Sequence, residues 1–246
     1  MKQKFLLLLL PLAVFMFSAC KKSDDNNPPD DRLPNTPIAK AIYNNSNFGI
    51  YKGVFIGSTG NIEINVNNDN TLKAVLEIDG VTSTYTSAQT VAQNQASTIT
   101  FTSGVNSFVF STTATGSNPT ITGITIAGHP NSGISLLKEK SDSLVKCYEG
   151  TFKSSRSSGT FNMVINAGVM SGVYNEVGAT SAPPKMNGSV TNNQLSAFSE
   201  DPDIYLPQCT YKGTSITGAI SANGQTISGT YSNCYGSGTW TGERTK

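Results

Sequence analysis

Histidine is nearly absent from this sequence, since His129 is the only one, and cysteine occurs just four times in 246 residues. A catalytic triad or a histidine-rich zinc site would depend on this one side chain, which sits in a Gly-His-Pro-Asn turn sequence. The cysteines are also too scattered for the paired spacing of a structural zinc site. We therefore expect a chain without enzyme activity and without a cofactor.

Charged residues are scarce as well, at 13% of the chain, and 17 basic residues nearly balance 16 acidic ones. Nucleic-acid binding calls for a clustered basic face, so we expect no nucleic-acid partner. After Cys20, no apolar run is long enough to cross a membrane as a helix. Ser, Thr, Asn and Gly dominate instead, a composition typical of short strands and turns rather than helices.

The N-terminal stretch has the features of a secretory signal. Lys2 and Lys4 precede an uncharged apolar run, residues 5–19, which is too short to span a bilayer but suits a signal peptide. It ends in Phe17-Ser18-Ala19-Cys20, which resembles the lipobox of bacterial lipoproteins, although Phe17 stands where that family prefers Leu. The resemblance implies cleavage after residue 19 and lipidation of Cys20, which would hold the protein on a membrane. An ordinary secretory signal that happens to contain a cysteine is the alternative.

The residues after Cys20 predict a disordered tether over 20–42, because prolines and aspartates keep such a chain extended and solvated. No aspartate follows Cys20 directly, and a short acidic cluster, Asp24-Asp25, lies just downstream. These features resemble lipoprotein sorting signals and imply an outer-membrane location, with exposure on the cell surface somewhat favoured.

From Tyr43 onward the chain alternates apolar and polar residues in short runs, as half-buried strands do. Asp79-Gly80 is a typical hairpin turn sequence. The sequence thus predicts an all-β fold of antiparallel meanders, as a barrel or a sandwich. The expected strands are 62–66, 72–78, 98–102, 107–111, 120–126, 160–165, 170–174, 215–220, 226–231 and 238–241.

A faint internal repeat, offset by about 95 residues, divides the chain further. Residues 51–55 match 148–152, residues 61–80 parallel 160–178, and residues 121–125 echo 216–220. We predict two related β units, 43–140 and 141–246, after the signal peptide (1–19) and the tether. Chance similarity is the alternative, and one continuous sheet would then replace the two units.

Glycines inside the expected strands permit tight coiling and close backbone approach, as small closed barrels require. Ser228-Gly229-Thr230-Tyr231, followed by residues 238–242, loosely resembles the closing strands of calycin barrels such as avidins and lipocalins. The resemblance implies no ligand residue.

Three cysteines remain besides Cys20. A disulfide between Cys209 and Cys234 is predicted, with Cys147 free, because both lie in the second unit; a Cys147–Cys234 bridge is the alternative. The acidic residues Glu200, Asp201 and Asp203 form a weak metal or catalytic candidate, for which a solvated loop is the simpler interpretation.

Aromatic residues crowd the last forty positions. Tyr205, Tyr231, Tyr235 and Trp240 are the candidate ligand-binding residues, although aromatics in strands mostly fill the core. We expect a lipid-anchored cell-envelope protein that binds a glycan or a small apolar ligand without catalysis. The alternative is a structural or assembly partner that docks another envelope protein through exposed sheet edges. A closed apolar cavity would favour the first role, and a filled core with open edges the second.

Overall fold

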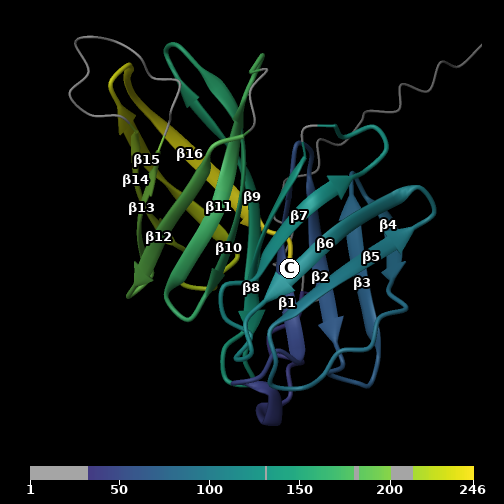
Figure 1. Ribbon diagram of the computed structural model, residues 1–246. Helices are drawn as coiled ribbons and strands as arrows, with labels where there is room; N and C mark the ends of the chain where they lie inside the picture. Colours follow the sequence, from purple (N-terminus) through teal and green to yellow (C-terminus); the bar gives the residue numbers. More distant parts are fainter. Residues whose placement is uncertain (1–32, 131, 180–182, 201–212) are drawn as a thin grey trace, which may run out of the picture. The chain divides into compact units, whose positions relative to one another are not determined.

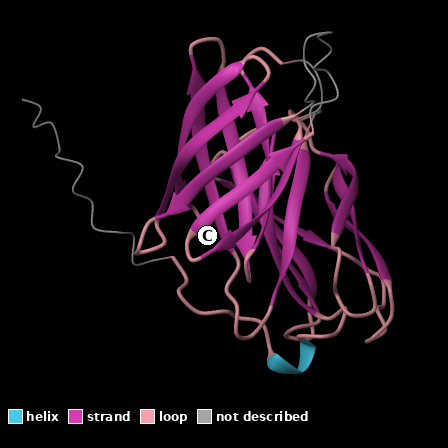
Figure 2. Cartoon of the chain, turned by 90° about the vertical axis from the view of Figure 1, so that its left-hand side faces the viewer, coloured by secondary structure: helices cyan, strands magenta, loops and turns pink. Residues whose placement is uncertain are grey.

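The computed structural model describes residues 33–130, 132–179, 183–200 and 213–246, all within the range Arg32–Lys246. Nearly all regular structure in these ranges is strand, and the helical part is a three-residue 3-10 helix, Ala41–Tyr43 (Figure 2). None of the described residues form a helix with the length and apolarity needed to span a membrane.

The strands form two sets of eight, one from each half of the chain (Figure 1). The first set is β1 (Gly49–Ile56), β2 (Gly60–Val66), β3 (Leu72–Ile78), β4 (Val81–Thr86), β5 (Ser97–Ser103), β6 (Asn106–Thr112), β7 (Thr120–Thr125) and β8 (Gly133–Glu139). The second set is β9 (Lys146–Ser154), β10 (Ser158–Asn166), β11 (Val169–Glu176), β12 (Lys185–Thr191), β13 (Gln194–Ser199), β14 (Thr214–Ile220), β15 (Thr226–Asn233) and β16 (Gly236–Arg244).

Both sets are antiparallel meanders in which successive strands pair, with the exception of β7 and β8. The second set closes completely, because β9 pairs with both β10 and β16. In the first set β1 pairs with β8, while the edge strands β7 and β8 contact each other without a ladder, so that this barrel is nearly closed. The predicted all-β, antiparallel, two-unit fold is confirmed, and its units are barrels.

Many strand predictions are also confirmed. The Asp79-Gly80 hairpin joins β3 to β4 with positive φ angles of 51° and 77°, as its sequence predicts. The list of expected strands missed β1, β4, β8, β9, β12 and β13, although the repeat had already matched residues of β1 with residues of β9. Of the three repeat matches, the first two relate equivalent strands, β1 to β9 and β2–β3 to β10–β11. The third relates β7 to β14, which hold different places in their sheets, so that match is wrong.

The predicted tether is too long at its C-terminal end. Residues 33–42 were expected to be disordered, yet the backbone N–H groups of Ile38 and Lys40 donate to Glu139 (2.8 Å) and Asn68 (3.0 Å). The Asn68 amide in turn donates to the Ile38 carbonyl (3.2 Å). The sequence could not show these partners, because they lie 28 to 101 positions away.

The two barrels meet along the outer faces of β1 and β10, a contact that we call the junction. β1 is buried along its whole length, because its inner face fills the first barrel and its outer face packs on the second. The apolar part of the junction comprises Val54, Val145, Cys147 and Val164, with Leu137 beside them. Strands that are buried on both faces lose the alternation of apolar and polar residues, which explains why β1 does not alternate.

Polar contacts complete the junction. The Asn162 amide donates to the carbonyls of Phe55 and Ser58, the latter at 3.1 Å. The Gly60 N–H donates to Glu149 Oε1 at 2.8 Å. Beside them, Lys52 and Glu139 form an ion pair of 2.7 Å, and both residues are at most 1% exposed. The buried charges of Lys52 and Glu139 therefore compensate each other.

The carboxyl of Glu149 gives the junction a pH dependence. Burial, followed by repulsion from Glu77 and Asp79, raises its pKa above the usual 4.5. Between pH 4.5 and the raised pKa, the folded protein holds a proton that the unfolded chain has released. The stability of the folded state therefore falls as pH rises from 4.5 through the raised pKa. Glu149→Gln keeps an acceptor for Gly60, so its Tm should exceed that of the wild type by about 1–3 °C at pH 7 and match it near pH 4. Thermal melts across this range, with exposed Asp142→Asn as control, check the prediction; parallel profiles for wild type and Glu149→Gln would contradict it.

The free thiol of Cys147 reports on whether the junction is closed. It is fully buried, its Sγ donates to the Gly53 carbonyl (3.4 Å), and burial raises its pKa to about 12. We expect native protein not to react with a maleimide at neutral pH, and reaction to follow urea unfolding. Thr151→Cys, which places an exposed thiol on the same face of β9, should react at once. Equal rates for the two thiols in native protein would show that the junction opens readily.

Candidate functional site

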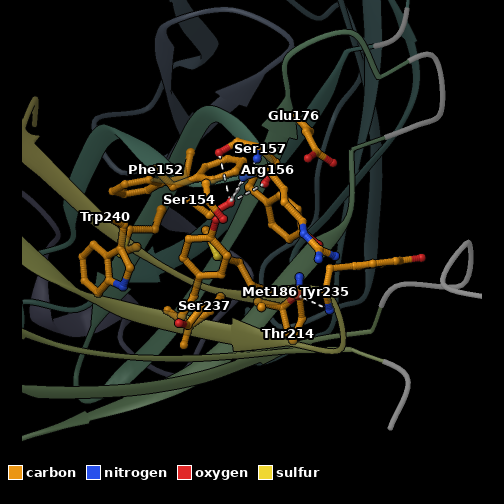
Figure 3. Close-up of a pocket in the computed structure, with 18 residues that line it drawn as sticks. Phe152, Ser154, Arg156, Ser157, Glu176, Met186, Thr214, Tyr235, Ser237 and Trp240 are labelled. Atoms are coloured by element: carbon orange, nitrogen blue, oxygen red, sulfur yellow. Dashed lines mark hydrogen bonds between the residues drawn. The ribbon is translucent and has the colours of Figure 1, made fainter. Parts of the chain in front are cut away.

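The second barrel contains a cavity of about 420 Å³ at one end (Figure 3). The rim is formed by the β9–β10 and β15–β16 turns and the adjoining strand ends. The inner lining is aromatic and aliphatic: Phe152, Phe161, Met163, Tyr174, Met186, Ile216, Tyr231 and Trp240. The rim is polar: Ser154, Ser155, Arg156, Ser157, Glu176, Thr214, Asn233, Tyr235, Gly236 and Ser237. An apolar interior with a polar mouth is the usual form of a small-molecule site.

Inward-facing glycines make room for the aromatic rings. A Cβ atom on Gly218 would lie 2.3 Å from Trp240 Cζ2, and one on Gly229 would lie 2.7 Å from the same atom. In the same way, a Cβ on Gly238 would lie 2.5 Å from Tyr231 Cε1. The glycine-rich strands therefore let large rings lie flat on the barrel wall, which leaves space at the centre.

The rings hold one another in edge-to-face pairs. Phe161 and Trp240 have centroids 5.5 Å apart, and Phe152 contacts Tyr231 at 5.7 Å and Tyr174 at 5.8 Å. The Trp240 Nε1–H donates to the Thr230 carbonyl (3.2 Å), so its polar atom is satisfied. A wall of this kind is pre-organised, because the rings have little freedom to rearrange.

The Tyr231 hydroxyl is the exception in this wall. Tyr231 is 9% exposed, and its oxygen is buried without a hydrogen-bond partner among the described residues. At the opposite end of the barrel, the buried hydroxyl of Tyr148 donates to the Gly224 carbonyl (2.9 Å). Buried polar groups are nearly always paired, so one hydrogen bond is missing at this point of the cavity wall.

Turn hydrogen bonds fix the rim. Ser154 Oγ accepts from the backbone N–H groups of Arg156 (3.1 Å) and Ser157 (3.0 Å), and Asn233 Oδ1 accepts from the Tyr235 N–H (2.9 Å). Figure 3 shows Phe152 and Trp240 on one side of the site and Tyr235 on the other. The mouth therefore has a defined form with an exposed guanidinium, that of Arg156, beside it.

Three of the four candidate ligand-binding residues line this one cavity. Tyr231 and Trp240 form part of its inner wall, and Tyr235, 39% exposed, lies on its rim. Tyr205 lies outside the described residues. Sequence reasoning missed Phe152 and Phe161, although their alternation with Gly150 and Gly159 was an available signal.

The remaining candidates stay predictions. Glu200 is exposed beyond the end of β13, and Asp201 and Asp203 lie outside the described residues. In the described ranges no group of acidic, histidine or cysteine side chains could hold a metal ion. Cys234 is not a free thiol, whereas Cys209 falls in a range that is not described, so their pairing is untested.

The first barrel, by contrast, has a filled interior. Aromatic rings pack against one another inside it, including Phe101 on Phe108 at 5.4 Å and Tyr51 on Phe110 at 4.8 Å. Ile126, from the β7–β8 connection, also belongs to this core, and His129 in the same connection contacts the Phe55 ring (5.4 Å). The predicted turn residue His129 thus lies in a turn and packs on an aromatic side chain.

Comparisons with known proteins give little further. No family model matches this chain, and no curated protein matches it. One solved chain, described as "Crystal Structure of Surface Lipoprotein", is similar over 80% of this chain and 98% of its own length, with 10% identity and a TM-score of 0.32. A TM-score this low carries no argument about function.

Proposed function

We propose that this chain is a lipid-anchored cell-envelope protein whose second barrel binds a small, largely apolar molecule that carries a polar group. The observation that carries the proposal is the aromatic cavity with its polar rim, whose wall includes Tyr231 with an unpaired hydroxyl. Leaving a buried hydroxyl unpaired costs about 1–3 kcal/mol, which a ligand with a suitably placed polar atom would recover.

The size and lining of the cavity support a compact ligand. Its volume of about 420 Å³ lies toward the lower end of the range of small-molecule sites, roughly 300–1,000 Å³. A ligand that fills the cavity would bury apolar surface against its aromatic and aliphatic lining, at about 25 cal/mol per Å². An aromatic or alicyclic molecule fits this wall well.

A glycan is less well supported. Sugar-binding platforms present aromatic faces that a sugar ring can reach from solution, whereas Trp240 is 5% exposed and Tyr231 9%. Tyr235 on the rim is the accessible ring of the three. We therefore favour the small apolar ligand over the glycan.

Docking through sheet edges has less support too. The second barrel is closed and offers no edge, and the edge strands of the first barrel, β7 and β8, contact each other. A cavity in one barrel and a filled core in the other favour ligand binding by the second unit. The closed meander also accords with the calycin resemblance of β15 and β16.

The proposed role is binding without catalysis. Ser154, a hydroxyl on the rim, is occupied by its turn, where it accepts from two backbone N–H groups. His129, the one histidine of the chain, lies in the β7–β8 connection of the other barrel.

The anchor is supported by the sequence of residues 2–20, with Cys20 as the lipidated residue. Acyl chains contribute about 0.8 kcal/mol for each buried CH₂ group, so more than one chain gives stable attachment. The membrane would be the partner of the N-terminus, the location the outer membrane, and the cell surface the favoured face.

Trp240 is the one tryptophan of the chain and lies in the cavity wall, so its fluorescence tests ligand binding directly. We expect both naphthalene and 1-naphthol to change it saturably, with 1-naphthol binding about fivefold more tightly, because one hydrogen bond is worth about 1 kcal/mol. Tyr231→Phe should abolish that preference and leave naphthalene affinity unchanged.

Tyr148→Phe is the matched control, since it removes a buried hydroxyl from the same barrel that is already paired. It should lower the unfolding free energy by about 1 kcal/mol and keep the preference for 1-naphthol. A saturable response with neither probe, or the same preference in Tyr231→Phe, would contradict the proposed site.

Lipidation is tested separately. Wild-type protein should incorporate a fatty-acid probe in cells and partition with membranes, and Cys20→Ala should do neither. Cys147→Ala, which removes a buried thiol and leaves the signal intact, is the control that should still be labelled. Label that persists in Cys20→Ala would contradict the anchor.

A further inference from the structure

We propose that the cavity opens away from the membrane, so that its ligand enters from the aqueous phase and not from the bilayer. This inference rests on the proposed function, both its anchor and its binding site. It follows from where the chain enters the folded part and where the cavity opens.

Strand β16 runs from the mouth of the cavity to the point where the incoming chain is held. Its first residues, Gly236 and Ser237, line the mouth, and its last residue is Arg244. Nine residues of extended strand separate the mouth from Arg244 by roughly 25 Å. In Figure 1 the strand runs from its turn with β15 toward the C-terminus, marked C.

Arg244 holds the incoming chain at this far end. It is 7% exposed, and its guanidinium donates to the Pro34 carbonyl and to Asn35 Oδ1 (3.4 Å). Ile38 is then bonded to Glu139, the last residue of β8. The segment that follows the tether is therefore fixed at the end of the barrel opposite to the mouth.

The same segment exposes apolar side chains. Ile38 is 50% exposed and Ile42 72%, and the basic Lys40 lies between them. The residues between Cys20 and Leu33 can span at most roughly 45 Å, so a lipidated Cys20 holds this segment within that distance of the bilayer. Isoleucines flanking a lysine suit contact with the lipid headgroup region. The bilayer surface is the partner that covers the exposed side chains of Ile38 and Ile42.

The orientation narrows the class of ligand. A mouth that faces away from the bilayer receives molecules dissolved in water, and membrane phospholipid would have to leave the bilayer to reach it. The ligand class is therefore a sparingly soluble aromatic or alicyclic molecule with a polar group, captured from outside the membrane.

The test uses the full, lipidated chain in vesicles that contain a headgroup nitroxide phospholipid. A fluorophore is attached at Ile42→Cys, on the tether side, or at Val177→Cys, which is 78% exposed and follows Glu176 of the rim. Cys147 is buried and Cys234 is not a free thiol, so they do not compete for the label. We expect the Ile42 label to lose most of its fluorescence and the Val177 label to lose little.

Quenching at Val177 as strong as at Ile42 would overturn the orientation, and so would a chain without lipid on Cys20. Binding of 1-naphthol to the soluble Cys20→Ala protein, measured by Trp240 fluorescence, separates the two proposals. If 1-naphthol binds there while Val177 is strongly quenched, the binding site stands and only the orientation fails. Failure to bind in solution would reject the proposed function itself.

Discussion

The contact between the outer faces of β1 and β10 is the constraint that shapes both barrels. It needs one strand in each barrel that is buried on both faces over most of its length, and it buries the Lys52–Glu139 pair beside an apolar cluster. Removing one member of such a pair leaves a lone buried charge, at a cost of about 3–5 kcal/mol. Glu139 also accepts from Ile38, so the same carboxylate positions the incoming chain.

The two barrels share a topology but use their interiors differently. The first is filled by rings that stack on one another, and the β7–β8 connection contributes Ile126 to its core. In the second, glycines under Trp240 and Tyr231 keep the rings against the wall and leave a cavity between them. We thus propose a binding function for the second barrel. The first barrel holds the second in place relative to the point where the chain enters the fold.

Sequence reasoning reached part of this arrangement, and its failures have different physical causes. Alternation found β2, β3, β5 and β6, since strands with one solvated face alternate. It said nothing of the contacts that fix Ile38, because those partners are remote in the chain. It also related β7 to β14, because short Ile-Thr-Gly runs recur by composition alone.

The sequence by itself determined the β class, the meander order, the turn at Asp79-Gly80 and three aromatic residues that line the cavity. These follow from local periodicity and turn chemistry, which a few neighbouring residues specify. Only the tertiary structure decided that the second barrel closes, that Tyr231 faces a cavity with its hydroxyl unpaired, and that the chain enters opposite to the mouth. Closure and burial depend on pairing between distant strands, such as β9 with β16, and on how glycines and rings meet across them.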